Sequence, residues 1–170
     1  MKKLILSITV ICFTLVIHAQ TNPVDEMFDK YSEKDGFTVV SISSRMLSMF
    51  AGQDSEDKSA DNLFARLKSI RIISVEDSLL NKDLNFYTEL RKKLDLSVYE
   101  ELMIVKEGKD ITRFLIKQKG EVITELLVIT GGPGGNSLIS IRGDLDLKSI
   151  SNISKEMGIK DLEELEKMKK

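Results

Sequence analysis

Helical and strand-like hydrophobic patterns alternate along the first half of the chain. Val24, Met27, Phe28 and Tyr31 recur at helical spacing, which predicts a short amphipathic helix over residues 24–31. The pattern then predicts a strand over residues 37–42 and a helix over 46–50 that Ser43 or Ser44 caps. A short helix over 63–67, a strong strand over 70–75 and a long helix over 78–94 follow.

The second half of the chain reads as strands joined by short connectors. Apolar runs rich in β-branched residues predict strands, and Gly-containing connectors this short imply an antiparallel meander. The four strands span residues 102–106, 111–118, 122–130 and 137–142. A short turn or helix over 145–153 and a charged terminal helix over 160–170 would follow.

These elements together predict an α+β fold: a mainly antiparallel sheet of about five to six strands with helices packed on one face. Val122 to Ile129 is almost entirely apolar, which favours a central strand. Ile111 to Gln118 alternates less evenly, which favours an edge or a half-exposed position.

Residues 1–19 have the three parts of a secretory signal peptide. Lys2 and Lys3 precede an apolar run from Leu4 to Ile17, and Ala19 offers a small residue before Gln20. We expect cleavage between Ala19 and Gln20 and an exported protein of the periplasm or outer cell envelope. The alternative is a retained anchor helix, but the run is short for a bilayer, which needs about 20 residues.

Residues 20–170 then form a single domain of ordinary size, with no further transmembrane segment. The whole chain has 25 basic and 27 acidic residues, and the signal removes two of the lysines. The domain is therefore mildly acidic and has no cluster of basic residues. Because proteins that bind nucleic acid usually carry such a cluster, its charge gives no reason to expect nucleic-acid binding.

Cleavage of the signal would also remove two residue types that often act in catalysis, Cys and His. The chain has one Cys and one His, Cys12 and His18, and no Trp. A nucleophile activated by His and a soft-metal site built from Cys and His are therefore excluded from the mature domain. A Ser-Lys pair stays open in principle, although no motif singles one out. We predict no catalytic, cofactor-binding or metal-binding residue and no cofactor.

Two acidic or glycine-rich segments have a plain structural interpretation. Asp54, Glu56, Asp57 and Asp61 cluster, but their spacing matches no complete calcium loop, which favours a solvated loop. Residues 131–135 lack the lysine and the following helix of a phosphate loop, so they indicate a flexible hairpin connection.

Two further patterns are equally weak. Arg142-Gly143-Asp144 spells an adhesion tripeptide, but a strand end at Gly143 explains it as well. Glu121 and Glu125 would share a strand face, and we expect such a carboxylate pair to be solvated rather than catalytic.

The order of several short segments resembles the family catalogued as domain of unknown function 4252, found in exported proteins of Bacteroidota. The resemblance covers most of residues 20–170 and implies an envelope location and an α+β fold. The family has no established catalytic residues to transfer. The similar segments are Phe28–Tyr31, Val39–Ser43, Ile70–Ile73, Tyr99–Met103, Glu125–Val128 and Ile141–Leu147.

We therefore expect a non-enzymatic module that binds an envelope protein or another envelope component, through one sheet face or the loop at 53–61. One alternative is an enzyme of unrecognised type that uses only Asp, Glu, Lys, Arg, Ser or Tyr. A pocket that gathers such groups with shifted pKa values would favour it. Another is a structural or assembly protein, which an unpaired strand edge would favour.

Overall fold

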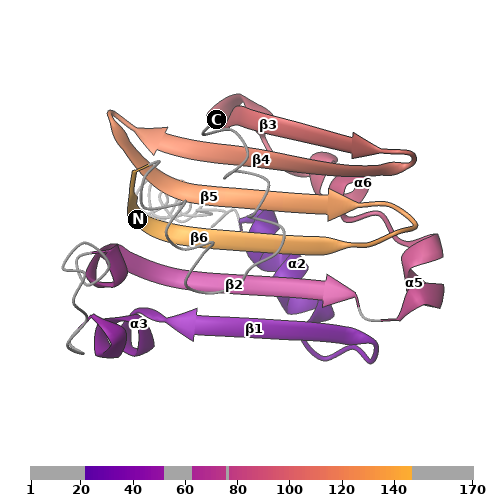
Figure 1. Cartoon of the computed structure of the whole chain (residues 1–170), viewed down its shortest axis with the longest axis horizontal. Coiled ribbons are helices and arrows are strands. Elements are labelled where there is room, and N and C mark those ends of the chain that lie inside the picture. The colour runs from indigo at the N-terminus through magenta and orange to yellow at the C-terminus, as the bar shows by residue number, and fades with distance from the viewer. Residues whose placement is uncertain (1–21, 52–62, 76, 147–170) are drawn as a thin grey trace, which may run out of the picture.

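A computed structural model describes residues 22–51, 63–75 and 77–146 of the chain. Six strands form one antiparallel sheet in the order β1-β2-β6-β5-β4-β3 (Figure 1). The predicted α+β class with a mainly antiparallel sheet is confirmed. The strands are β1 Phe37–Ser43, β2 Leu67–Val75, β3 Glu100–Glu107, β4 Asp110–Lys119, β5 Val122–Gly131 and β6 Ser137–Leu145.

The predicted meander is confirmed, because β3, β4, β5 and β6 each pair antiparallel with the next strand. β5 lies in the middle of the sheet, as its apolar sequence predicted. β4 is an interior strand, not an edge, because β3 pairs along its other side. Its uneven pattern instead reflects partial exposure: its first four residues are half-buried and its last three are exposed.

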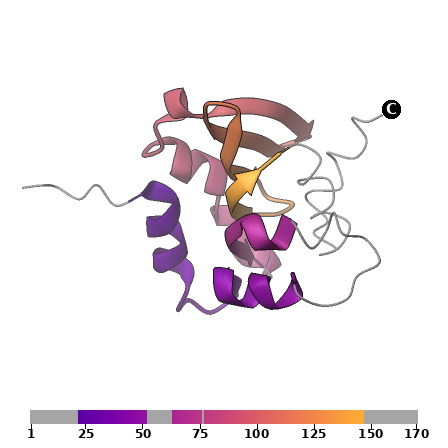
Figure 2. The same cartoon turned by 90° about the vertical axis from the view of Figure 1, so that its left-hand side faces the viewer.

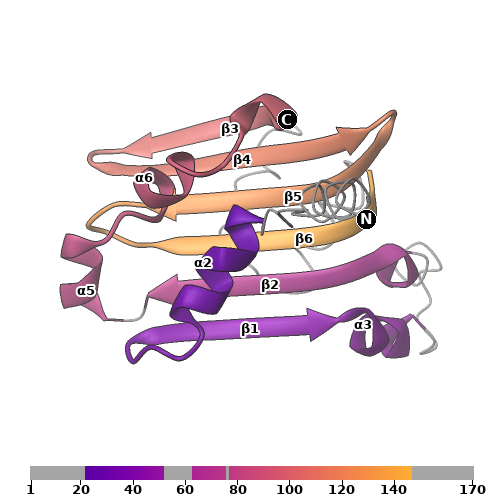
Figure 3. The same cartoon turned by 180° about the vertical axis from the view of Figure 1, so that it is seen from behind.

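Two helices cross one face of the sheet (Figures 2 and 3). They are α2, Pro23–Tyr31, and α6, Phe86–Arg91. α2 starts where Asn22 Oδ1 accepts the backbone N–H of Val24, with Pro23 at the first helical position, where its missing N–H costs nothing. The apolar stripe expected at helical spacing is the buried side of α2.

The prediction of one long helix over 78–94 was wrong. The segment forms two short helices, α5, Ser78–Asp83, and α6, and a 3-10 turn η1, Leu96–Val98, follows it. Leu84 is extended, with φ −104° and ψ 150°. Asn85 caps α6 by accepting the N–H of Thr88 at 2.8 Å. This local side-chain bond competes with continuation of α5, so the apolar stripe alone was a poor guide.

α3, Ser44–Phe50, begins after Ser43, whose side chain accepts the N–H of Met46. This confirms the predicted cap. Residues 63–66 are helical and β2 starts at Leu67, so the short helix predicted over 63–67 ends one residue earlier. Leu47 of α3 joins the core on the sheet face opposite α2 and α6.

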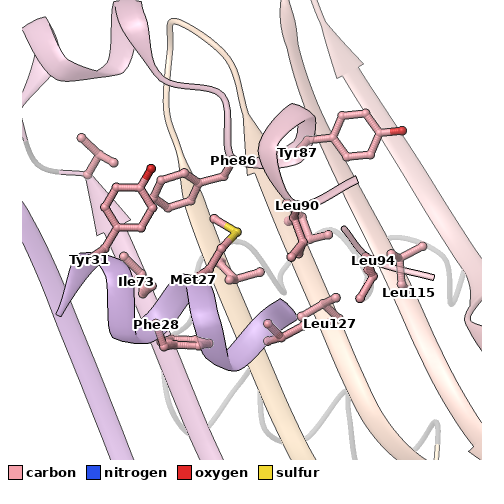
Figure 4. Packing of buried hydrophobic residues seen from close by; sticks show 14 residues of the cluster. Met27, Phe28, Tyr31, Ile73, Phe86, Tyr87, Leu90, Leu94, Leu115 and Leu127 are labelled. Carbon is pink, nitrogen blue, oxygen red and sulfur yellow. The ribbon is translucent and has the colours of Figure 1, made fainter. Parts of the chain in front are cut away.

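The sheet separates two hydrophobic clusters. The cluster on the face of α2 and α6 is drawn in Figure 4 and includes Phe28, Tyr31, Ile73, Phe86, Leu90, Leu127 and Leu138. The cluster on the opposite face includes Leu47, Leu63, Ile70, Phe114, Leu126, Val128, Ile139 and Ile141. The middle strands are therefore buried on both faces, which explains the continuous apolar run of β5.

Candidate functional site

Polar side chains from neighbouring strands meet on the face that carries α2. The strand register places Arg71 of β2 opposite Ser140 of β6, and Arg142 of β6 opposite Glu125 of β5. Asp25, in the first turn of α2, lies against the two arginines. Charged groups therefore occupy core-facing positions beneath one end of α2, and we call these residues the ion-pair network.

Glu125 is the most deeply buried charged group of the ion-pair network, with its side chain 5% exposed. It accepts hydrogen bonds from Tyr99 Oη at 2.9 Å, Ser140 Oγ at 2.7 Å and Arg142 Nε at 2.8 Å. A buried carboxylate is tolerable only when it is paired and hydrogen-bonded. These donors meet that condition, so Glu125 is a fixed part of the core.

Asp25 links the helix to two strands. Its Oδ1 lies 2.9 Å from Arg71 Nη1 and 2.9 Å from Arg142 Nη1. Arg71 also lies over the ring of Phe28, 4.1 Å from its centroid. Asp25 and Glu125 carry two negative charges and the arginines two positive ones, so these four groups balance.

This environment fixes the protonation of Tyr99 and Arg142. Burial first, and then the charge of Glu125, raise the pKa of Tyr99 well above its usual value. Burial alone would lower the pKa of Arg142, but the charges and hydrogen bonds of Glu125 and Asp25 outweigh it and raise that pKa. Tyr99 thus stays a neutral phenol and Arg142 stays a cation at physiological pH.

A groove of about 740 Å³ opens beside the ion-pair network. It lies between the start of α2, the segment from the end of α6 to Tyr99, and strand β4. Both polar and apolar residues line it. Its lining residues are Asn22, Pro23, Glu26, Lys93, Leu94, Asp95, Val98, Tyr99 and Lys117.

The charges of the groove differ in how they are held. Lys93 Nζ pairs with Glu26 at 2.8 Å. Asp95 accepts the N–H and the hydroxyl of Ser97, and these bonds lower its pKa. Lys117 is exposed, lies 6.0 Å from the centroid of the Tyr99 ring, and forms no ion pair within the part of the chain that the structure describes. Lys117 is therefore the charge most open to a ligand.

Tyr99 joins the groove to the ion-pair network. It lines the groove, while its hydroxyl donates to Glu125 inside the network. Because Glu125 is held in turn by Arg142, the groove wall is connected to Asp25 and α2 through fixed contacts. The lining around Tyr99 is therefore preorganised.

A second polar centre fixes the glycine-rich connection between β5 and β6. Asn136 Nδ2 donates to Asn81 Oδ1 and to the backbone oxygens of Leu84 and Gly132, and its Oδ1 accepts the N–H of Phe86. A side chain at Gly132 would clash with Asp110. The predicted hairpin connection is confirmed, but it is held by hydrogen bonds rather than loose.

The adhesion tripeptide is not presented as a unit. Arg142 is committed to Glu125 and Asp25, with its side chain 26% exposed. A Cβ at Gly143 would lie 2.6 Å from the backbone oxygen of Arg66, so this glycine allows a close strand contact. The tripeptide therefore serves the fold at this point of β6.

The other candidates have different outcomes. The prediction of a solvated Glu121–Glu125 pair was wrong, because Glu125 is buried and Glu121 precedes β5. The acidic cluster Asp54, Glu56, Asp57 and Asp61, the tail 160–170 and the cleavage position Ala19–Gln20 lie outside the described residues.

Two kinds of feature are absent from the described residues, 22–51, 63–75 and 77–146. No group of three or more His, Cys, Asp or Glu in these ranges could hold a metal ion. No helix within them is long and apolar enough to cross a membrane.

The ion-pair network was missed at the sequence level, although one signal was available. Glu125 interrupts an apolar run that was expected to be a central strand. A carboxylate in such a strand is buried on either face and must have partners. The sequence could therefore have marked Glu125 as paired, but not which residues pair with it.

Comparisons with known proteins give a family but no characterised relative. A family model described as domain of unknown function (DUF4252) matches residues 31–153, more than half of the chain. No curated protein and no solved structure matches the chain.

Proposed function

Since the chain belongs to the family described as domain of unknown function (DUF4252), we propose that it is an exported, non-enzymatic binding module of the cell envelope. In this proposal a partner protein or another envelope component binds in the groove beside Tyr99. The observation that carries it is the fixed groove wall, with apolar surface beside an exposed Lys117 that forms no ion pair with any described residue.

The groove lining suits an amphipathic partner. Val98 is 46% exposed although it is apolar, so a ligand can still bury it. Lys117 can bind an acidic group at the same time, and Tyr99 offers a flat ring beside it. Binding sites commonly combine such apolar contacts with a few polar groups that orient the ligand.

The state of the ion-pair network supports binding over catalysis. Glu125 already accepts three hydrogen bonds, and its charge is balanced by Arg142. The raised pKa of Tyr99 opposes loss of its proton. A general base needs a free lone pair and a pKa near the working pH. The groups of the network are thus better suited to hold the groove than to transfer protons.

The binding proposal is tested with paired variants of exposed residues. Lys117→Glu combined with Val98→Asp changes the groove, whereas Lys106→Glu changes an exposed lysine outside it. A component captured from envelope extract is identified, and its affinity is then measured by calorimetry. We expect the groove variant to bind at least about tenfold more weakly and the control to bind normally. Equal binding by all three proteins would overturn the proposal.

Export is tested separately. The full chain is expressed in its own host, and the mass of the recovered protein is measured in each cell fraction. A protein that starts at Gln20 and is found in the envelope fraction agrees with the proposal. An intact chain in the cytoplasm contradicts it.

An enzyme is the second candidate, favoured by the gathering of carboxylates, arginines and a tyrosine with a shifted pKa beside the groove. Its test is whether the captured component is chemically altered by the protein. Turnover that Tyr99→Phe abolishes, while binding persists, would favour the enzyme and reject the non-enzymatic module.

A further inference from the structure

The outer edge of β1 carries backbone groups that no other described strand pairs with. Within the described residues β1 pairs only with β2, and it ends the strand order (Figure 1). The N–H of Val75 donates to Asn136, on the side of β2 away from β1. The pair Phe37–Val75 is therefore a non-hydrogen-bonded pair between β1 and β2.

This fixes which groups point outward. Phe37 directs its N–H and C=O away from β2, and Val39 and Ser41 follow with the same orientation at every second residue. No described residue bonds these outward groups. β1 therefore offers a regular row of donors and acceptors to another strand.

The two edges of the sheet are protected very differently. β3, at the other edge, contains Glu100, Glu101, Lys106 and Glu107, and its register shifts between Glu101 and Met103. Charges and bulges of this kind oppose edge-to-edge pairing. β1, over Phe37–Ser43, has no charged residue and no proline, and its pairing with β2 has no register shift.

Exposed apolar side chains accompany the open edge. Val40, in the middle of β1, is 39% exposed, and Met46 and Met49 of α3 are 46% and 64% exposed. α3 follows β1 directly in the chain. A partner strand along β1 would cover Val40 as well as satisfy the backbone.

We propose that β1 is a self-association edge, where two copies of this chain pair antiparallel about Val40 and join their sheets. In this register each residue of Phe37–Ser43 lies opposite a residue of the same strand in the second copy. Val39 and Ser41 exchange backbone hydrogen bonds across the interface, and Val40 meets Val40 of the second copy.

A second copy fits better than an unrelated strand because the sequence of β1 is compatible with itself. The register places Thr38 opposite Ile42 and Val40 opposite Val40, so no like charges meet. The groove residues Tyr99 and Lys117 lie towards the opposite edge of the sheet, where β3 and β4 are. The inference is therefore independent of the proposed function.

A cysteine cross-link tests the register. All variants are made in the full chain with Cys12→Ala, which removes its one native thiol. Val40→Cys places two thiols in a non-hydrogen-bonded pair, where Cα atoms lie about 4.5 Å apart, within disulfide range. Ile104→Cys is the matched control, because Ile104 lies on the edge strand β3 and is 36% exposed.

We expect Val40→Cys to form a covalent dimer on mild oxidation, and Ile104→Cys to stay monomeric on a non-reducing gel. In the same register Thr38→Cys should cross-link to Ile42→Cys when the two variants are mixed. Equal cross-linking of Val40→Cys and Ile104→Cys would mean random collision and would overturn the proposal.

A charge variant tests the association itself. Val40→Lys would bring two like charges together at the centre of the interface, whereas Ile104→Lys adds the same charge at the other edge. We expect sedimentation to show a dimer for the unmodified chain and about a tenfold or larger rise in the dimer dissociation constant for Val40→Lys alone. Circular dichroism checks that both variants fold.

Two results would overturn the proposal. One is an unmodified chain that sediments as a monomer at its highest soluble concentration. The other is equal weakening by Val40→Lys and Ile104→Lys. A monomer that instead captures a foreign extended peptide, and loses it on Val40→Lys, would assign the edge to a different partner.

Discussion

α2 lies across the sheet (Figure 3) and contacts it through two regions with opposite chemistry. Near its end, Tyr31 packs against Phe37 and Phe86 at ring-centroid distances of 4.7 and 5.1 Å. Near its start, Asp25 bridges Arg71 and Arg142. One helix of nine residues therefore combines an aromatic cluster with an ion-pair network.

The difference shows how stability and position are divided between the regions. Apolar contacts stabilise in proportion to buried area and have little directional preference. Charged hydrogen bonds have defined lengths and angles, and an unsatisfied buried charge is strongly unfavourable. We infer that the aromatic cluster holds α2 on the sheet and that the ion-pair network fixes where its first turn, and hence the groove beside it, lies.

The largest effect is expected in the aromatic cluster. Phe86 is fully buried, and Phe86→Ala should lower the free energy of unfolding by about 4 kcal/mol, through lost contacts and a residual cavity. Urea denaturation measures this, and the loss should change little with salt concentration. A loss below about 1 kcal/mol would mean that the cluster collapses around the gap.

Breaking one side of the ion-pair network should come next. Arg142→Met leaves Glu125 buried without its cation and should cost about 3 kcal/mol. The double variant Arg142→Met, Glu125→Met should regain part of that loss, because no uncompensated charge remains. This account of the region would be contradicted if the double variant lost more free energy of unfolding than the two single variants lose together.

Tyr99→Phe is a smaller test of the same region and should cost about 2 kcal/mol, since it removes a donor to a buried carboxylate. The pKa of Tyr99 is raised in the folded state, so its contribution is fully present below the unfolded pKa near 10.0 and is lost as the pH rises beyond it. Denaturation of the wild type and of Tyr99→Phe between neutral and alkaline pH measures how their difference in free energy of unfolding changes with pH. A constant difference would contradict the pKa assignment.

The smallest effect is expected at the exposed rim between α2 and α6. Glu89 pairs with Lys30 at 2.5 Å and accepts from Tyr31 at 2.7 Å. Burial would raise the pKa of Glu89, but these partners outweigh it and lower that pKa. Glu89→Gln should cost about 0.5 kcal/mol at neutral pH, as exposed pairs typically do.

The sign of this effect can be tested by pH. The contribution of Glu89 is present above its unfolded pKa near 4.5 and is lost as the pH falls through the lower folded value. Wild type and Glu89→Gln should thus converge in stability on acidification. Divergence at low pH would show that another group dominates there.

Local pattern was a good guide where a single feature dominates an element. The stripe of α2, the cap at Ser43 and the four strands from β3 to β6 were all predicted, because periodicity and turn residues act over a few neighbours. The helix over 78–94 failed because the Asn85 cap competes with an apolar stripe that continues past it.

Prediction was weakest where distant residues share one site. Arg142 was considered only as part of a tripeptide, and Glu125 only as half of a solvated pair. Their contact depends on the antiparallel register of β5 and β6, and the contact with Asp25 spans 117 positions of the chain. The spacing of residues along the sequence does not predict contacts between residues so far apart in the chain.

The sequence by itself determined the class of the fold, the apolar faces of its elements and the order of its second-half strands, because these follow from short-range periodicity and turn chemistry. The tertiary structure alone decided that Asp25, Arg71, Glu125 and Arg142 neutralise one another and that Tyr99 connects them to a groove. It also decided that, among the described residues, no strand pairs with the outer edge of β1. Those outcomes depend on which strands become neighbours. Neighbour choice is set by the free energy of burying both sheet faces at once, a property of the whole domain and not of any segment.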